Sequence, residues 1–222
     1  MKPRLSHQRN HALTLVEVLV VIIILAVLVA MILPALKAAK HGGGPGCYGN
    51  LRQIGLAYQI WAGDNGDKFP MEVSVTNGGT MELFRGESQF QNLPFLNYLA
   101  MPNELSTPRV LHCPADTNHV AALNFTNGFS NSSISYFVGL DANTKSPQAI
   151  LSGDDNFAIG GVPVRPGRLE LSTNSPIAWT GSRHKLAGNI GLADGSVQSV
   201  NNSNLTNLFQ QTGLATNRLA VP

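Results

Sequence analysis

The feature that most constrains this chain is an apolar run over residues 13–36, LTLVEVLVVIIILAVLVAMILPAL, close to the N-terminus. The run contains one charged residue, Glu17, and no further charge occurs for 19 residues, until Lys37. A helix of about 20 apolar residues is long enough to cross the hydrocarbon core of a bilayer. We therefore expect a membrane-spanning helix that carries a carboxylate near its N-terminal end.

A short polar segment precedes the run. Residues 1–12 carry Lys2, Arg4 and Arg9 and no acidic residue. Basic residues on the N-terminal side of a span are held in the cytoplasm, so the rest of the chain is expected outside it. A secretory signal peptide has a shorter apolar core followed by a small-residue cleavage site, whereas this run continues directly into LKAAKH. The helix is therefore expected to remain as an anchor.

The junction ALTLVE resembles the prepilin processing site of type IV pilins and type II secretion pseudopilins. In that family a prepilin peptidase cuts just before a T-L-[VI]-E run and N-methylates the new first residue. The resemblance implies cleavage between Ala12 and Leu13, with Glu17 as the fifth residue of the mature chain and Pro34 as the twenty-second. The chain departs from the family pattern on both sides of the cut, where Gly and Phe are preferred.

The resemblance also gives Glu17 and Pro34 roles in assembly. In a bundle of such helices, a buried carboxylate pairs with the free amine of a neighbour's first residue, here Leu13. Because an unpaired carboxylate costs about 2–3 kcal/mol on insertion scales, Glu17 is expected to set the register of adjacent subunits. The alternative is that Glu17 lies at the headgroup level and is solvated. Pro34 removes a backbone donor and kinks the helix.

Residues 47–222 are expected to form one extracytoplasmic domain. Beyond the leader the chain has 12 basic and 13 acidic residues, so its basic isoelectric point does not indicate a nucleic-acid partner. Apolar residues at helical spacing predict a helix over 47–62, and alternating runs around Asp194-Gly195 predict a hairpin. Strands are also expected at 81–84, 134–140 and 149–152, and a helix at 204–211.

His184, Asp194 and Gly195 share an H-x9-D-G spacing within SRHKLAGNIGLADGS. This segment resembles a C-terminal module of prepilin-like proteins, and CYGNLRQIGLAYQIWAGDNGDKFP and LHCPAD resemble other segments of them. The resemblance implies a pilin-like α+β fold, in which a long N-terminal transmembrane helix packs on an antiparallel sheet. It implies no catalysis and gives no role to the three residues. The turn alone explains Asp194 and Gly195, and a metal site at His184 and Asp194 is the alternative.

Both cysteines, Cys47 and Cys113, are expected outside the cytoplasm, where a disulfide between them would join the helix to the sheet. Two free buried thiols are the alternative. A zinc site at His112, Cys113 and His119 is disfavoured because the segment lacks a paired C-x2-C motif.

Calcium is the cofactor that the resemblance suggests, because some pseudopilins hold this ion in a loop near the C-terminal strands. The candidate ligands are Asp154, Asp155 and Asp194, together with the turn residues Asp64 and Asp67. No single loop supplies the six or more oxygen ligands that calcium requires. Solvated turn carboxylates are therefore the alternative.

Motifs of catalysis are weak in this chain. The sequence has no G-x-S-x-G elbow, H-E-x-x-H pair or phosphate-binding loop. Ser182, His184 and Asp154 are the residue types of a catalytic triad, but their presence in the sequence does not establish its geometry. We therefore do not expect an enzyme.

These observations predict a structural pilin or pseudopilin subunit, with residues 1–12 as cytoplasmic leader, 13–41 as transmembrane and assembly helix, and 47–222 as the extracytoplasmic domain. The expected partners are homologous subunits, prepilin peptidase, an inner-membrane assembly platform and the lipid bilayer. The expected location is the bacterial inner membrane, in a single pass, with the C-terminal domain in the periplasm or on a surface filament. A tethered binding module that does not assemble and an anchored hydrolase are the alternatives.

Overall fold

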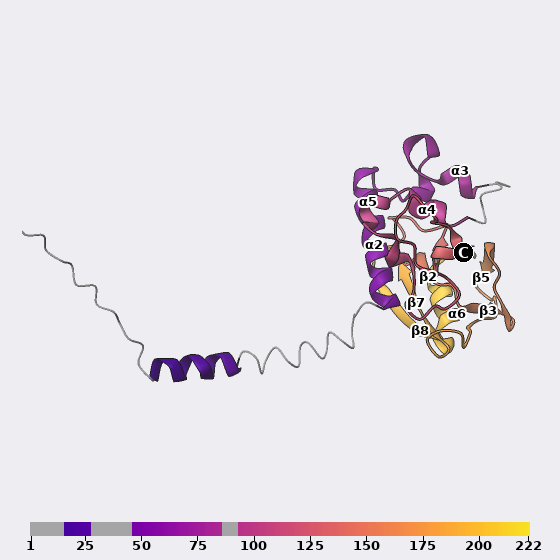
Figure 1. The fold of residues 1–222 in the computed structure, drawn as a ribbon. Coiled ribbons are helices and arrows are strands. Elements are labelled where there is room, and N and C mark those ends of the chain that lie inside the picture. The colour runs from indigo at the N-terminus through magenta and orange to yellow at the C-terminus, as the bar shows by residue number, and fades with distance from the viewer. Residues whose placement is uncertain (1–15, 28–45, 86–92) are drawn as a thin grey trace, which may run out of the picture. The chain divides into compact units, whose positions relative to one another are not determined.

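The computed structural model describes residues 16–27, 46–85 and 93–222. The chain divides into two compact units, Met1–Gly44 and Pro45–Pro222. In the N-terminal unit, residues 16–27 are helical (Figure 1). The predicted cleavage site at Ala12 and Leu13 and the predicted kink at Pro34 lie outside the described residues.

A six-stranded antiparallel sheet forms the centre of the C-terminal unit, with strand order β5-β9-β1-β2-β7-β8. A three-stranded antiparallel sheet has the order β4-β3-β6. The strands of the larger sheet are β1 (Tyr136–Gly139), β2 (Ile150–Asp154), β5 (Gly167–Ser172), β7 (Ala187–Leu192), β8 (Val197–Asn201) and β9 (Thr216–Val221). Those of the smaller sheet are β3 (Phe157–Ile159), β4 (Val162–Pro163) and β6 (Ile177–Trp179).

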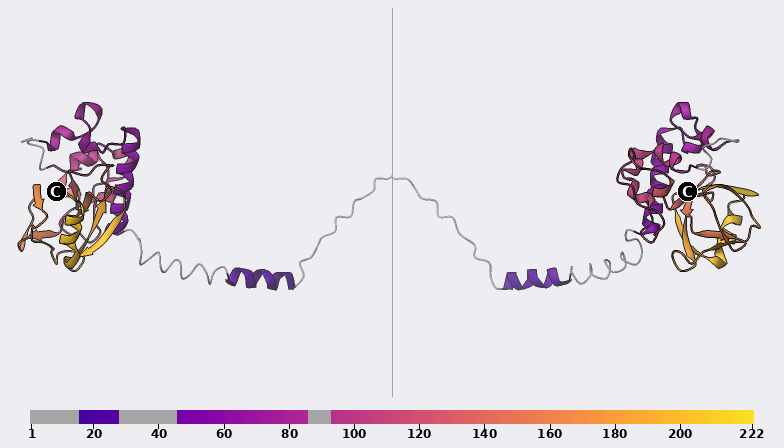
Figure 2. Two further views of the ribbon diagram at one scale, coloured as in Figure 1. Left: turned by 180° about the vertical axis from the view of Figure 1, so that it is seen from behind. Right: turned by 45° about the vertical axis from the view of Figure 1, so that its right-hand side comes forward.

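Helix α2 (Cys47–Asp64) lies along one face of the larger sheet and packs against β2, β7 and β8 (Figure 1, Figure 2). Its apolar stripe, which includes Leu51, Ile54 and Tyr58, is fully buried. Seven short helices are described between α2 and β1. They are α3 (Met81–Phe84), α4 (Phe95–Leu99), α5 (Pro102–Leu105), η1 (Pro70–Glu72), η2 (Val75–Asn77), η3 (Pro108–Leu111) and η4 (Asn131–Ser133).

The opposite face of the larger sheet packs against a second cluster, to which β6 and helix α6 (Asn202–Gln211) contribute. Because side chains alternate between faces along a strand, β1 contributes to both clusters. Tyr136 and Val138 join the cluster on the α2 side, and Phe137 joins the cluster on the other side. The central strands are therefore buried on both faces, and the domain has three layers.

The structure confirms the α+β class and the antiparallel sheets. The predicted helix at 47–62 is α2, the predicted hairpin is β7–β8, and the predicted C-terminal helix is α6. The strand predicted at residues 81–84 is wrong, because this segment is helix α3. The Leu83 backbone N–H donates to the Thr80 carbonyl at 3.0 Å, within one turn of chain. Alternation over four residues is too short to separate a strand from a helical turn.

Replacing Leu51 tests whether α2 owes its place to packing on the sheet. Leu51 is 1% exposed, whereas Leu56 on the same helix is 59% exposed. We expect Leu51→Ala to lower the free energy of unfolding by about 2–5 kcal/mol and Leu56→Ala to change it by less than about 0.5 kcal/mol. Urea unfolding followed by tryptophan fluorescence measures both. Equal effects of the two substitutions would contradict the packing of α2 described above.

Candidate functional site

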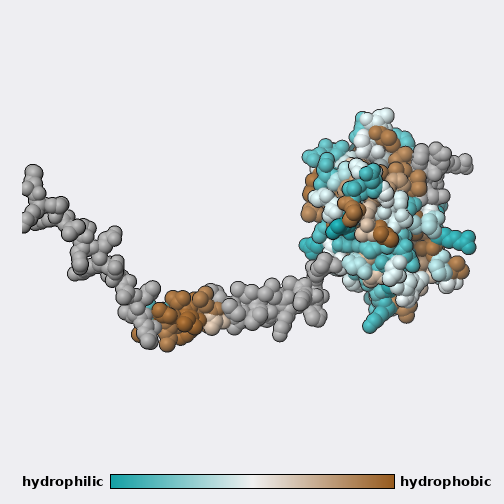
Figure 3. All heavy atoms as spheres, viewed as in Figure 1, coloured by the Kyte–Doolittle hydropathy of each residue, from teal (hydrophilic) through white to brown (hydrophobic). Residues whose placement is uncertain are grey.

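The helix over residues 16–27 presents apolar side chains on all sides. Its valines, leucines and isoleucines range from 46% exposed at Val18 to 67% at Val16. The face visible in Figure 3 is strongly hydrophobic, and Glu17, which is exposed, is the one charged residue of this stretch. A helix that is apolar all round is stable only where a membrane or neighbouring helices bury it. This segment is therefore a candidate assembly site.

Among the helices that the structure describes, none has both the length and the apolar character needed to cross a membrane. The span predicted for residues 13–41 continues on both sides of 16–27, and those parts lie outside the described residues.

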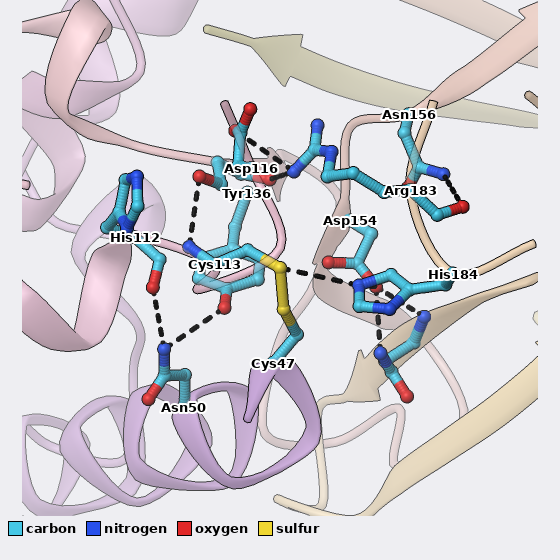
Figure 4. The surroundings of a disulfide bond; sticks show 12 residues. Cys47, Asn50, His112, Cys113, Asp116, Tyr136, Asp154, Asn156, Arg183 and His184 are labelled. Carbon is cyan, nitrogen blue, oxygen red and sulfur yellow. Dashed lines mark hydrogen bonds and ion pairs between the residues drawn. A yellow bond between two sulfur atoms is a disulfide. The ribbon is translucent and has the colours of Figure 1, made fainter. Parts of the chain in front are cut away.

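A second candidate site surrounds a disulfide between Cys47 and Cys113 (Figure 4). Cys47 is the first residue of α2, and the two Cα atoms are 5.0 Å apart. Asn50, within the first turn of α2, donates from Nδ2 to the carbonyl of His112 at 2.8 Å and to the Tyr136 hydroxyl at 3.2 Å. The bond joins residues 66 apart in sequence, for which the chain-entropy model gives about 4 kcal/mol. The disulfide thus fixes the start of α2 to the segment that precedes the sheet.

His184 lies against this disulfide. Its Nε2 atom is 3.3 Å from Cys113 Sγ and 3.7 Å from Asp154 Oδ2 (Figure 4). His184, Lys185 and Leu186 have φ angles of 54°, 52° and 66°, a region that non-glycine residues seldom adopt. This left-handed turn leads into β7 and leaves the His184 side chain 25% exposed.

Asp154 ends β2, and its carboxylate is completely buried. Its Oδ2 atom accepts from the backbone N–H of Asn189 at 2.7 Å and from Nδ2 of Asn189 at 2.8 Å, and Oδ1 has no hydrogen-bond partner. Burial raises the pKa of Asp154, while the hydrogen bonds from Asn189 and the charge of His184 oppose that shift. Ser199 donates to Asn189 Oδ1 at 2.7 Å, which orients the amide.

Arg183 is the buried cation of this region. Its guanidinium pairs with Asp155 and lies 3.1 Å from Asp116 Oδ2. His119 Nδ1 is 2.7 Å from the same Asp116 oxygen. Although burial alone raises the pKa of Asp116, its hydrogen bonds, the first of them with His119, and the charge of Arg183 together hold this pKa well below its usual range.

The residues of the H-x9-D-G motif stand at opposite ends of β7. His184 precedes the strand and contacts the disulfide, whereas Asp194 and Gly195 form the turn that follows it. Gly195 has a φ of 81°, and the Ser196 N–H donates to Asp194 Oδ1 at 2.8 Å. The metal pair of His184 and Asp194 considered from the sequence is therefore not formed.

The hairpin turn lies directly on α2. A Cβ atom on Gly55 would be 3.2 Å from the Gly195 Cα, so the helix and turn backbones approach without a side chain between them. Gln59, one turn along, donates its amide N–H to the carbonyl of Ala193. The two ends of β7 therefore meet α2 at separate places, one through the disulfide and one through the turn.

The structure separates the three calcium candidates. Asp154 and Asp155 are adjacent, but Asp194 lies beyond the far end of β7, where its N–H donates to the Pro147 carbonyl at 3.2 Å. Asp155 is paired with the guanidinium of Arg183, so its charge is already balanced by a cation. The three carboxylates do not form one coordination shell.

The zinc set at His112, Cys113 and His119 does not form either, because both imidazoles have other partners. His112 Nε2 lies 3.0 Å from the His119 carbonyl, and His119 Nδ1 lies 2.7 Å from Asp116 Oδ2. In the triad considered from the sequence, His184 does meet Asp154, but the Ser182 hydroxyl pairs with Thr180 Oγ1 at 2.7 Å.

Sequence reasoning missed Arg183, Asp116 and Asn189. Arg183 immediately precedes His184, and Asp116 ends the LHCPAD segment. Their proximity to residues already singled out was the available signal. Their partners are distant in sequence, so the pattern alone could not identify the network.

A family model described as the prokaryotic N-terminal methylation motif matches residues 7–33. No curated protein and no solved structure gives a significant match to the chain. The matched segment contains the predicted processing site and the exposed apolar helix. This match supports a type IV pilin-like N-terminal segment, of the kind that a prepilin peptidase processes, over residues 7–33.

Removing the Asp116 carboxylate tests its role as a buried charge. A carboxyl group whose folded-state pKa is depressed stabilises the fold above its ordinary pKa of 3.8, and this contribution is lost as the pH falls. We expect Asp116→Asn to lower the free energy of unfolding at neutral pH by about 1–3 kcal/mol. The free energy of unfolding of this variant should also fall less steeply on acidification than that of the wild type. Urea unfolding at a series of pH values measures this. Asp64→Asn, at an exposed position, is the control, and a slope unchanged by Asp116→Asn would contradict the assignment.

Proposed function

We propose that this chain is a structural subunit of a type IV pilus-like filament or a type II secretion pseudopilus. Prepilin peptidase would trim it between Ala12 and Leu13, and the N-terminal helix would assemble with those of other subunits. The observation that carries the proposal is that the segment matched by the methylation motif includes a helix with apolar side chains exposed on every side. Such a helix gains stability by packing among its own kind or in lipid.

Glu17 would fix how the helix of one subunit is aligned with the helix of its neighbour. The Glu17 carboxylate is the single charge among residues 16–27, and an opposite charge stabilises a carboxylate in an apolar surrounding. A free N-terminal amine at Leu13, created by cleavage, is the compensating charge that each neighbouring subunit brings. We infer that assembly is favoured in the alignment that brings this amine to Glu17.

The membrane setting belongs to the same proposal. The subunit would cross the bacterial inner membrane once and meet its assembly platform there, with the C-terminal unit in the periplasm or on the cell surface. No catalytic step and no nucleic acid are part of this function.

Processing can be read directly from the mass of the native protein. We expect the purified protein to lack residues 1–12 and to carry one added methyl group on the amine of Leu13. Mass spectrometry of the N-terminal peptide measures both, with cells lacking prepilin peptidase as the control. An intact leader, or a new N-terminus downstream of residue 36, would contradict the proposal.

Substitution of Glu17 separates an assembling subunit from a simple tether. We expect Glu17→Ala to be cleaved normally while the filament yield falls at least tenfold. The substitution leaves the charged amine of the neighbour's Leu13 without its partner in an apolar surrounding, and a cost of about 2–3 kcal/mol corresponds to more than one factor of ten. Glu17→Asp keeps the carboxylate and should assemble far better. Quantifying the subunit in sheared filaments measures the difference. Normal assembly of Glu17→Ala would favour the tethered binding module.

A further inference from the structure

Four side chains that carry metal-ligand atoms meet at the disulfide. The ligand atoms of Cys47, Cys113, Asp154 and His184 all lie within 4.8 Å of one another. They come from four separate places, namely the start of α2, the segment after η3, the end of β2 and the turn before β7 (Figure 4). Because the surrounding fold positions each of them, the cluster does not depend on one flexible loop.

We propose that these four residues form a tetrahedral zinc site when the Cys47–Cys113 disulfide is reduced. Two thiolates, an imidazole nitrogen and a carboxylate oxygen are ligand types that zinc takes in proteins. None of the metal sets considered from the sequence contained this combination. The proposal concerns the C-terminal unit and is independent of filament assembly.

The spacing of the ligand atoms fits a tetrahedron. With zinc–sulfur bonds of about 2.3 Å and zinc–nitrogen or zinc–oxygen bonds of about 2.0 Å, adjacent ligands lie roughly 3.3–3.8 Å apart. In the structure, His184 Nε2 is 3.3 Å from Cys113 Sγ and 3.7 Å from Asp154 Oδ2. The main adjustment needed is the separation of the two sulfur atoms once their bond is broken.

The buried carboxylate supplies a second, independent argument. Asp154 is completely buried, and its Oδ1 atom has no hydrogen-bond partner. Such an atom is uncommon in native proteins and requires an explanation. Asn189 donates two hydrogen bonds to Oδ2, the oxygen that lies 3.7 Å from His184 Nε2, and Ser199 orients Asn189. The carboxylate is thereby held in place next to His184 while Oδ1 keeps its capacity to accept. Metal-binding carboxylates are typically oriented by outer partners of this kind.

The redox step balances with a dithiol reductant. The reductant transfers two electrons and two protons to the disulfide, which opens to two thiols, and the reductant itself becomes a disulfide. Zinc then displaces the two thiol protons into solvent and binds both thiolates. Disulfide and zinc therefore exclude one another, yet each connects Cys47 at the start of α2 to Cys113.

The test uses the full chain, purified in detergent and reduced without oxygen by a phosphine. Cobalt(II) serves as the spectroscopic probe. We expect one equivalent to give the visible absorption of a tetrahedral thiolate complex, which zinc then displaces, and zinc to raise the unfolding temperature of the reduced chain. The oxidised chain should give neither result. Absence of a one-to-one cobalt complex in the reduced chain would overturn the proposal.

Variants identify the ligands. His184→Gln and Asp154→Asn should lose the one-to-one complex, whereas His112→Gln, outside the four-residue cluster, should retain it. Circular dichroism of each oxidised variant establishes that it is folded. If His184→Gln is folded and binds cobalt as wild type does, His184 is not a ligand and the site as proposed is wrong.

Discussion

The C-terminal unit depends on the close contact between α2 and the hairpin β7–β8. Gly55 and Gly195 bring the two backbones together, and the stripe of Leu51, Ile54 and Tyr58 closes the core on that face. Short helices, α5, η1 and η3 among them, pack beside α2. The disulfide at Cys47 then adds a covalent connection at one end of a contact that packing already defines.

Because the central strands are buried on both faces, charged residues at their ends are buried too, and nearby polar side chains pair with them. Every residue of β2 is buried, including Asp154 at its end, and the side chain of Asp155, the next residue, is 8% exposed. Buried charges destabilise a fold unless they are paired. Arg183 pairs with Asp155, while Asn189 and His184 face Asp154. The polar cluster beside the disulfide is thus a consequence of where the central strands end.

Local patterns in the sequence predicted the elements that are specified locally. The periodicity of α2, the Asp194-Gly195 turn and the apolar face of α6 each lie within one short segment, and all three were found. The pairing of β5 with β9 joins Gly167 to Val221, and no short window contains both strands. The site shows the same division. The apolar run over residues 13–36 was evident from composition. Asp154, His184 and the disulfide, however, meet only because the sheet topology brings four distant segments together.

The position of the disulfide has a mechanical consequence. The covalent path from the N-terminal unit enters the globular fold at Cys47, the first residue of α2. Tension on that path would otherwise peel the helix from the sheet one turn at a time. The disulfide instead transmits the force directly to Cys113. The backbone N–H of Cys113 donates to Ser135 Oγ at 3.0 Å, next to β1. Under traction the disulfide would therefore shield α2, which lies within the loop that this bond closes.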